Sequence, residues 1–490
     1  MRHLASLVLA AAVASGACTQ TPAEQQIVDD AAEAVGGAER ILAVKTLVIE
    51  GEGSNGNLGQ DMTPDAIGQT FTVTDYKRAI DVGSGRVRVE QTRTPTFTFF
   101  QGQQPQKQVF GVDGAVAYNV AASGNATRAN DVVAKDRRAE IYHHPITMLR
   151  AALDPAATLS NPRTQDNQSV VDITTPDGLM FTLAIDSTTK LPTRVVSMTD
   201  NTNLGDVAIE TSFADYQDVD GLQLPALLTT KTDKYTTAEL RVTRQAVDAA
   251  DAGDLAAPAA AASAAAPVPP PVMVTVEDVA PGVWWLAGGS HHSVLVEFAD
   301  HLTLIEAPQN DARTLAVIAK AREIRPDKPL THVVNSHHHF DHSGGIRAAV
   351  SEGLTVIAHK ASAQYFQDSV ARPHTIVPDA LAKNPMPLKI ETVDEELELK
   401  DATRTVNLYR IAGSPHAVTL LMAYFPQERI LVLGDVYTPG AALTPYAPNL
   451  MENITARKLS VDRIVPLHGM IGPYGDLVKV VQAAKPAAAN

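Results

Sequence analysis

The amino-acid sequence predicts an α+β protein with two folded parts, one mostly β and one in which strands and helices alternate. Three observations lead to this prediction. An Ala- and Pro-rich stretch divides the 490-residue chain at 249–272, Asp-Gly turn signals separate apolar runs before it, and apolar runs of strand and helix length alternate after it. A hydrophobic content of 45% and a charged content of 19% are typical of chains that form a core.

Residues 1–18 are typical of an export signal. A short basic start precedes the apolar run 4–14, which is too short to span a membrane permanently. The sequence SGAC at 15–18 resembles a bacterial lipoprotein box, although Ser15 stands where such boxes usually carry Leu. We therefore expect an exported, periplasmic protein that a lipid on Cys18 anchors to the outer membrane, with an ordinary cleaved secretory signal as the alternative.

Residues 24–248 form the first part, which we expect to be mostly β. Alternating apolar runs predict strands, and Asp-Gly pairs between apolar runs predict hairpin turns. The predicted strands cover 44–51, 71–82 and 86–92, and the turns lie at Asp113-Gly114, Asp177-Gly178 and Asp220-Gly221. Many strands with few helices indicate a curved sheet or half-barrel.

One helix is predicted in this part, over 135–153, with a break at Pro145. His143 and His144 are expected on its surface. In outline the part is similar to periplasmic lipoprotein-carrier domains, which cradle acyl chains. The alternative is a β domain that only spaces or stabilises the rest of the protein. The following stretch, 249–272, buries little apolar surface and is expected to be a semi-rigid linker.

Residues 273–490 form the second part. Strands are predicted at 293–298, 302–307, 331–335, 354–359, 405–411, 418–425 and 429–434. Helices are predicted over 311–324, with Asp311 as the N-cap, and over 476–484. The net charge of −15 disfavours nucleic acid as a partner, because phosphate binding needs clustered Lys and Arg. A small-molecule substrate is therefore expected.

The strand predicted at 331–335 leads into a histidine-rich loop with the pattern H-x-H-x-D-H. Its potential metal ligands are His337, His339, Asp341 and His342. Imidazole and carboxylate together suit zinc or a similar first-row metal. A lone histidine is usually a packed or surface residue, but four such groups within six positions indicate a metal site.

Three more potential ligands follow predicted strands, in the order His416, Asp435 and His468. Together with the histidine-rich loop, this order resembles the metallo-β-lactamase superfamily, and the resemblance covers about 274–482. It implies a four-layer αββα sandwich with the metal site at the rim between its two sheets.

Carried over to this chain, the resemblance implies two Zn²⁺ ions, with iron or manganese as alternatives. His337, His339 and His416 are then ligands of the first ion, Asp341, His342 and His468 are ligands of the second, and Asp435 bridges both. No thiolate is available to this site, because Cys18 is the only cysteine of the chain.

These ligands imply a zinc-dependent hydrolase in which a metal-activated hydroxide cleaves an ester-like bond: a thioester, a lactone or a carboxyl ester. Asp341 is expected to be catalytic as well as a ligand, orienting the nucleophile. An Asp at the bridging position resembles thioesterases and lactonases, so β-lactamase activity is not favoured. Two alternatives remain: a mononuclear iron enzyme resembling persulfide dioxygenases, and a lipid-binding lipoprotein with an accessory metal domain.

Three residues are weaker candidates for substrate binding. Tyr437 follows the bridging position by two residues, His374 lies in the irregular stretch 366–387, and His292, with His291 before it, lies where a flap could cover the site. A packed or surface role is the alternative for each. His338, at the variable position of the motif, is expected to point away from the metals.

Overall fold

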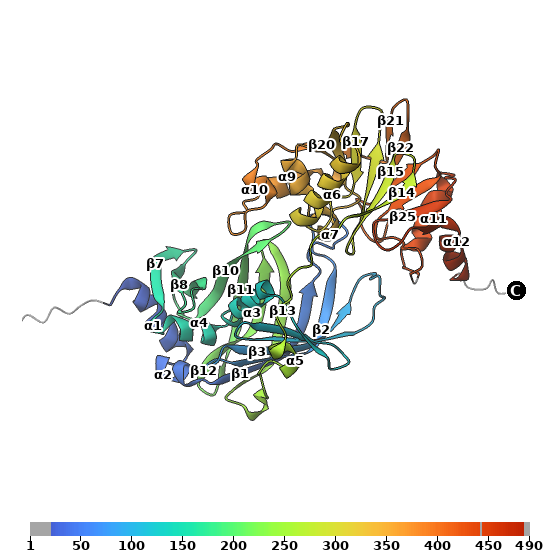
Figure 1. Cartoon of the computed structure of the whole chain (residues 1–490). Coiled ribbons are helices and arrows are strands. Elements are labelled where there is room, and N and C mark those ends of the chain that lie inside the picture. Colours follow the sequence, from blue (N-terminus) through green and yellow to red (C-terminus); the bar gives the residue numbers. More distant parts are fainter. Residues whose placement is uncertain (1–20, 442, 485–490) are drawn as a thin grey trace, which may run out of the picture.

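The computed structural model describes residues 21–441 and 443–484, which form a mixed, strongly sheet-rich α+β protein. A 13-stranded sheet belongs to the N-terminal half, and a 7-stranded and a 6-stranded sheet belong to the C-terminal half (Figure 1). The predicted export signal and Cys18 lie outside the described residues. Among the residues described, no helix is both long enough and apolar enough to cross a membrane.

The 13-stranded sheet is antiparallel throughout, and its first and last long strands pair with each other at its middle. Its order is β6-β5-β4-β3-β2-β1-β13-β12-β11-β10-β9-β8-β7. The Asp-Gly turns predicted from the sequence are confirmed, joining β4 to β5, β8 to β9 and β11 to β12. The strands are β1 (Thr46–Gly56), β2 (Thr70–Asp81), β3 (Arg86–Pro95), β4 (Gln106–Asp113), β5 (Val116–Val120), β6 (Ala126–Arg128), β7 (Thr158–Gln165), β8 (Gln168–Thr174), β9 (Met180–Asp186), β10 (Pro192–Asn201), β11 (Gly205–Val219), β12 (Leu222–Thr232) and β13 (Tyr235–Val247).

Four helices pack against this sheet and close its core: α1 (Ala23–Val35), α2 (Ala38–Ala43), α3 (Asp131–Ile141) and α4 (Pro145–Ala152). The predicted break at Pro145 is confirmed, because Pro145 is the first residue of α4, where its missing N–H leaves no hydrogen bond unmade. The sequence reasoning missed α1 and α2, which are Ala-rich helices of 13 and 6 residues.

The stretch predicted as a linker is partly ordered against the N-terminal half. It contains a 3₁₀ turn (Ala250–Ala252) and α5 (Ala259–Ser263), which lies against β5 and β6. Ala261 is fully buried there, and the Arg128 guanidinium donates to the Ala264 carbonyl at 2.9 Å. Alanine is small enough to pack closely on a sheet, so this stretch buries more surface than its composition suggested.

The C-terminal half contains two sheets whose strands follow the chain order. The 7-stranded sheet comprises β14 (Thr275–Ala280), β15 (Val283–Ala287), β16 (Ser293–Glu297), β17 (Leu302–Ile305), β18 (Leu330–Val334), β19 (Thr355–His359) and β20 (Lys389–Val393). The 6-stranded sheet comprises β21 (Glu396–Lys400), β22 (Thr405–Arg410), β23 (Leu421–Phe425), β24 (Ile430–Leu433), β25 (Arg463–Pro466) and β26 (Gly472–Pro473). The helices are α6 (Asp311–Ile324), α7 (Phe340–Ser343), α8 (Ile346–Ser351), a 3₁₀ turn (Lys360–Ser362), α9 (Ala363–Ala371), α10 (Ala380–Lys383), α11 (Ala447–Ala456) and α12 (Tyr474–Ala483).

Successive side chains of the C-terminal strands pack on opposite faces of their sheets, so the C-terminal core is divided into separate apolar clusters. Val294 and Val296 of β16 belong to a cluster shared with the 6-stranded sheet, whereas Leu295 between them packs with α6 and α8. A third cluster joins the outer face of the 6-stranded sheet to α11 and α12. This follows from the two-residue period of a strand, which sends neighbouring side chains to opposite faces.

The helix predicted at 311–324 is confirmed, but its N-cap was assigned to the wrong residue. The side chain of Asn310 accepts the Arg313 N–H and caps α6, and Asp311 is the first helical residue. Both positions suit the helix N-terminus, since a cap needs a side-chain acceptor and the first turn favours an acidic group.

Loops of the N-terminal sheet contact the C-terminal half around α7 (Figure 1). The ring of Phe340 packs in a small core with Leu204, Val207 and Tyr235. Nearby, Arg372 forms an ion pair with Asp233 at 3.1 Å. The two halves are thus joined by apolar packing as well as by the chain that connects them.

His143 and His144 are buried, which corrects the expectation that they lie on a helix surface. The ring of His143 is bonded to Thr211 Oγ1 at 3.0 Å and Ser197 Oγ at 2.9 Å, and His144 Nδ1 accepts the Ile146 N–H at 3.3 Å. Burial, together with the charge of Arg78, lowers the pKa of each to about 3. Both rings are therefore neutral in the native state at neutral pH.

We predict that the N-terminal half loses stability as the pH falls from about 6.5 towards 3. In that window the unfolded chain binds a proton at each histidine and the native protein does not, so each ring costs about 1 kcal/mol per pH unit. The measurement is urea unfolding of the metal-free chain by far-UV circular dichroism at several pH values. The variant His144→Gln should show a shallower pH dependence than the wild type; an identical slope would contradict the prediction.

Candidate metal centre

The seven residues predicted as metal ligands all lie on loops at the ends of strands from both C-terminal sheets. His337, His339, Asp341 and His342 follow β18 of the 7-stranded sheet, the last two on α7. His416 lies between β22 and β23, and Asp435 and His468 follow the parallel neighbours β24 and β25. The Leu421 N–H donates to the Ser336 carbonyl at 2.8 Å, which joins the two sheets at this point. The structure brings these loops together at one rim.

The first cluster consists of His337, His339, His416 and Asp435. His416 Nε2 lies 3.2 Å from His337 Nε2 and 3.2 Å from Asp435 Oδ2. His337 Nε2 lies 3.8 Å from the same carboxylate oxygen. A tetrahedral Zn²⁺ with Zn–N distances of 2.0–2.1 Å separates its ligand atoms by roughly 3.3–3.4 Å. The spacing of these atoms therefore fits a small tetrahedral ion.

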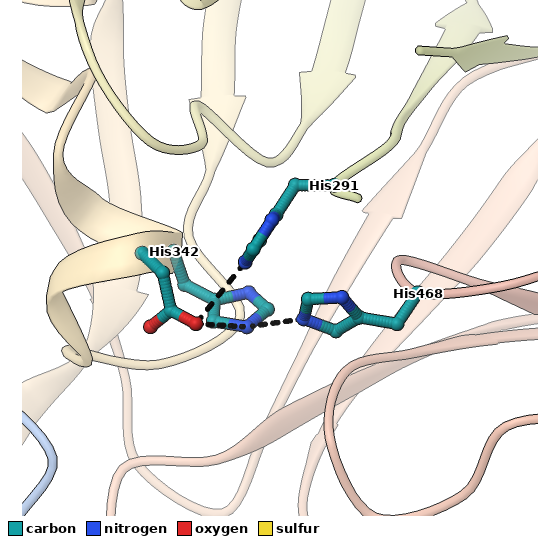
Figure 2. Close-up of side chains that lie close together, drawn as sticks. His291, His342 and His468 are labelled. Atoms are coloured by element: carbon teal, nitrogen blue, oxygen red, sulfur yellow. Dashed lines mark hydrogen bonds and ion pairs between the residues drawn. The ribbon is translucent and has the colours of Figure 1, made fainter. Parts of the chain in front are cut away.

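The second cluster consists of His291, Asp341, His342 and His468. Figure 2 shows the three imidazoles pointing toward one another. His468 Nε2 lies 3.0 Å from His342 Nε2, and His291 Nε2 lies 3.1 Å from Asp341 Oδ2. The sequence reasoning treated His291 only as part of a flap before the first hairpin, and its place in this cluster was missed.

Asp435 lies between the two clusters and directs one oxygen to each. Oδ2 faces His416 of the first cluster, and Oδ1 lies 2.9 Å from His342 Nε2 and 3.0 Å from His468 Nε2 of the second. A carboxylate in this position can bind one ion through each oxygen. Asp435 therefore faces imidazoles of both clusters.

The protonation of the imidazoles also fits a metal. His342 Nδ1 is bonded to Glu306 Oε2 at 2.8 Å, His468 Nδ1 donates to the Ser290 carbonyl at 2.8 Å, and His339 Nε2 donates to the Asp61 carbonyl at 2.9 Å. Each ring uses one nitrogen for the protein and turns the other toward its cluster, as metal-bound histidines do. The Nδ1 atom of His339 is buried and has no hydrogen-bond partner within the described part of the chain, so it has an unused lone pair in the site.

Electrostatics favour ionised carboxylate and neutral imidazole at the first cluster. Burial, reinforced by the neighbouring rings of His342 and His339, holds the pKa of His337 well below its usual value. For Asp435, burial alone raises the pKa, but the adjacent imidazoles outweigh it and hold the pKa well below the usual value. These are the protonation states that bind a cation. At His342 the balance is reversed: burial lowers its pKa, but Asp435 and Glu306 raise it well above the usual value.

Glu306 supports the second cluster and was missed from the sequence. It is fully buried, it accepts hydrogen bonds from Ser336 Oγ and the Asn335 side chain, and it holds His342 Nδ1. Its backbone φ of 82° lies in the left-handed region, which costs a residue other than glycine about 1–3 kcal/mol. In the sequence, the only sign of this role is an acidic residue directly after the apolar strand β17. An apolar strand that ends in Glu is common, so this pattern does not single out Glu306.

The weaker candidates lie in different surroundings. His292 packs its ring on Trp285 and accepts the Gly288 N–H at 3.2 Å, and Tyr437 is buried in the core beside α11 and α12. His374 lies against the β10–β11 turn, its ring 2.9 Å from where a Cβ on Gly205 would be, and it faces Asp379 at 3.6 Å. The structure thus places all three in packed or interfacial positions. His338 points away from both clusters, bonded to Thr419 Oγ1 at 2.7 Å and the Asp61 carbonyl at 3.0 Å.

Comparison with known proteins identifies the region that carries these clusters. Residues 286–468 match the model of the metallo-beta-lactamase superfamily. Among curated proteins no match was found. Similar solved structures include a metallo-beta-lactamase from Pontibacter korlensis (17% identity, TM-score 0.32, 43% of this chain and 99% of that one), one from Hirschia baltica (17%, 0.34, 44% and 99%) and FIM-1 from Pseudomonas aeruginosa in its mono-zinc form (18%, 0.34, 44% and 98%).

The C-terminal region therefore has a metallo-β-lactamase fold, and it presents two groups of His and Asp side chains able to hold metal ions. A region that matches the model of this superfamily and carries such groups suggests a metal-dependent hydrolase.

We predict that Glu306→Gln weakens metal binding by about 10–100-fold, the usual effect of losing a carboxylate that orients a metal-bound histidine. The amide keeps the size of the side chain but cannot accept from His342 with a negative charge. The measurement is zinc content after dialysis against a graded chelator. The matched control is Glu323→Gln on the exposed side of α6, which should retain wild-type zinc. Equal zinc retention by both variants would refute a role for Glu306 in the site.

Proposed function

We propose that the protein is an exported, dinuclear zinc-dependent hydrolase of an ester-like bond: a thioester, a lactone or a carboxyl ester. The observation that carries this proposal is the position of Asp435. Its two oxygens each face a separate set of imidazoles, at 3.2 Å on one side and 2.9–3.0 Å on the other. One carboxylate shared by two ligand sets supports two ions rather than one.

Two zinc ions held by the residues of the two clusters would lower the pKa of water, so that a nucleophile would be available at neutral pH, and would polarise the bond to be cleaved. Asp341 orients that nucleophile through the two oxygens of its carboxylate, which the protein holds from opposite directions. Gln60 Nε2 donates to Oδ1 at 2.7 Å and His291 Nε2 lies 3.1 Å from Oδ2. Burial raises the pKa of Asp341, but the His291 bond and His342 outweigh it and keep the pKa below its usual value, so the carboxylate is ionised.

The ligand set supports ester-like substrates over β-lactams. The bridging position holds Asp435, and the only cysteine is Cys18, so no thiolate can take part. Within the superfamily that this chain resembles, an Asp at this position is typical of thioesterases and lactonases. The proposed export to the periplasm rests on the sequence alone. The apolar run 4–14 before Cys18 supports export and a lipid anchor in the outer membrane.

The finer fold assignment is part of the same proposal. Three contact clusters, one between the two C-terminal sheets and one on each outer side with helices, support a four-layer αββα sandwich. In the N-terminal half, α1, α3 and α4 share a single core with strands from both ends of the 13-stranded sheet, which supports a sheet that curves around them.

We predict that Asp435→Ala removes metal and hydrolysis together, since it takes away the ligand shared by both clusters. Activity should fall by more than about 100-fold, beyond the effect of losing a residue that only orients a ligand. The measurements are elemental analysis and a panel of thioesters, lactones, carboxyl esters, phosphodiesters, sulfate esters and β-lactams. The control is Asp462→Ala, an exposed carboxylate in the same sheet region. Full hydrolysis by Asp435→Ala would refute the proposal, and one iron per wild-type chain in place of two zinc would favour a persulfide-dioxygenase-like enzyme.

A second candidate function belongs to the N-terminal half: binding of an apolar, acyl-like ligand. A cavity of about 640 Å³ lies between α3 and the 13-stranded sheet. Phe110, Phe181 and Leu228 are among its apolar lining residues, and Met180, exposed to 74%, belongs to its rim. Arg78 also lines it and offers a positive charge for a carboxylate headgroup. A largely apolar cavity, whose charged lining residues are the cations Arg78, Lys135 and Arg137 and the acids Asp136, Glu140 and Glu239, suits an amphiphile with a fatty-acid chain.

We predict that this cavity binds fatty acids with an affinity that rises with chain length, by up to about 0.8 kcal/mol for each methylene buried. The measurement is displacement of a fluorescent fatty acid from the full-length chain. Ala238→Trp, which fills the cavity, should abolish binding, whereas Ala214→Trp at an exposed position of β11 should not. Binding that is unaffected by Ala238→Trp would exclude this cavity.

A further inference from the structure

The connection between β1 and β2, residues 57–69, reaches out of the N-terminal sheet to α7 (Figure 1). We call it the β1–β2 loop. It is separated from the histidine-rich loop by about 280 positions in the chain, so every contact between the two depends on how the halves dock. The four consecutive residues Gly59 to Met62 each bond to the histidine-rich loop or to the loop that carries His416.

Two contacts go directly to predicted metal ligands. Gln60 Nε2 donates to Asp341 Oδ1 at 2.7 Å. The Asp61 carbonyl accepts from His339 Nε2 at 2.9 Å and from His338 Nε2 at 3.0 Å, which uses both of its lone pairs. A proton held on Nε2 of His339 leaves Nδ1 as the lone-pair atom, and Nδ1 is buried with no hydrogen-bond partner among the residues that the structure describes. The Asp61 carbonyl therefore selects the tautomer that can bind a metal.

Two backbone bonds clamp the β1–β2 loop from either side of the site. The Phe340 N–H donates to the Gly59 carbonyl at 3.0 Å, and the Val418 N–H donates to the Met62 carbonyl at 2.9 Å. Gly59 has a φ of 77°, and a Cβ there would lie 2.3 Å from the Phe340 ring, so only glycine allows this approach. The loop thus contacts two of the three segments that supply ligands to the first cluster, those that carry His339 and His416.

The β1–β2 loop is also stiff enough to position other groups. The buried carboxylate of Asp61 accepts the N–H groups of Met62 and Gln69, each at 2.7 Å, which closes the loop on itself. Asp65 ties it to the β12–β13 turn, through Tyr235 at 2.6 Å and Lys234 at 2.8 Å. A donor on a fixed loop loses little conformational freedom on bonding, so it orients its partner effectively.

We infer that the β1–β2 loop is a structural part of the metal centre, with Gln60 and Asp61 as positioning residues: Gln60 holds Asp341 in the second cluster, and the Asp61 carbonyl fixes His339 in the first. The inference rests on the proposed function in that it takes the two clusters as the metal site. The N-terminal half then has a role in metal binding, in addition to any apolar molecule that its own cavity binds. Docking of the halves and metal binding then reinforce each other, because each stabilises the arrangement that the other needs.

The test compares full-length variants at Gln60 by their affinity for Zn²⁺ in a chelator competition and by the visible spectrum of the Co²⁺-loaded protein. Gln60→Glu keeps the size of the side chain but replaces the amide donor with a carboxylate acceptor. Gln60→Ala removes the donor altogether. Both should weaken zinc binding at the second cluster, which contains Asp341, by about 10–100-fold and change the Co²⁺ spectrum of that cluster. Thr63→Ala, an exposed change in the same loop, is the matched control and should leave both readouts unchanged.

A second variant addresses the other arm of the loop. In Asp61→Asn the amide oxygen can replace only one of the two carboxylate acceptors, so the loop loosens and zinc affinity at the first cluster should fall. Thermal unfolding of each variant without metal separates this effect from a loss of folding, since the metal-free midpoints at Gln60 should match that of the wild type. Wild-type zinc affinities and Co²⁺ spectra in both Gln60 variants would overturn the inference. Because neither readout uses a substrate, a wild type that binds two zinc ions but cleaves no ester would refute the proposed function alone.

Discussion

The buried carboxylate of Asp435 imposes the constraint on which the rest of the site depends. A negative charge taken out of water is stable only with positive or hydrogen-bonding partners close by. Imidazoles from three separate loops meet this need within 3.2 Å. Each imidazole can serve only if its other nitrogen is satisfied elsewhere, and Glu306, the Ser290 carbonyl and the Asp61 carbonyl provide that. The site is therefore a set of linked hydrogen bonds whose inner atoms are left for a cation.

The strands of the C-terminal half hold the loops that carry the ligand residues in fixed positions. The parallel strands β24 and β25 bring the ends that carry Asp435 and His468 side by side, and β18 supplies the histidine-rich loop from the other sheet. The apolar cluster shared by the two sheets fixes their separation. Close packing allows little movement of the strand ends, so the ligand atoms keep spacings that suit a small ion. Strain at Glu306 is sustained by the same packing.

The two halves of the chain are more closely linked than two domains on a tether. The small core around Phe340, the Arg372–Asp233 ion pair and the bonds from Gln60 and Asp61 all cross between them near the metal ligands. Part of the Ala- and Pro-rich stretch is also packed on the N-terminal sheet, which shortens the free connection. A site built across such a boundary couples the state of one half to the chemistry of the other.

The sequence by itself determined the local features: the Asp-Gly hairpins, the break at Pro145, the alternating strands and the spacing H-x-H-x-D-H, because each depends on neighbours a few residues apart. It named the residue types that lie at the strand ends, and the structure brings those seven residues into two clusters. It could not reveal the burial of His143 and His144, the place of His291, or the roles of Glu306, Gln60 and Asp61. Those depend on which distant segments pack together, and Gln60 lies 281 positions from the carboxylate that it holds. Only the tertiary structure decided them, since a hydrogen bond between distant segments leaves no periodic trace in either one.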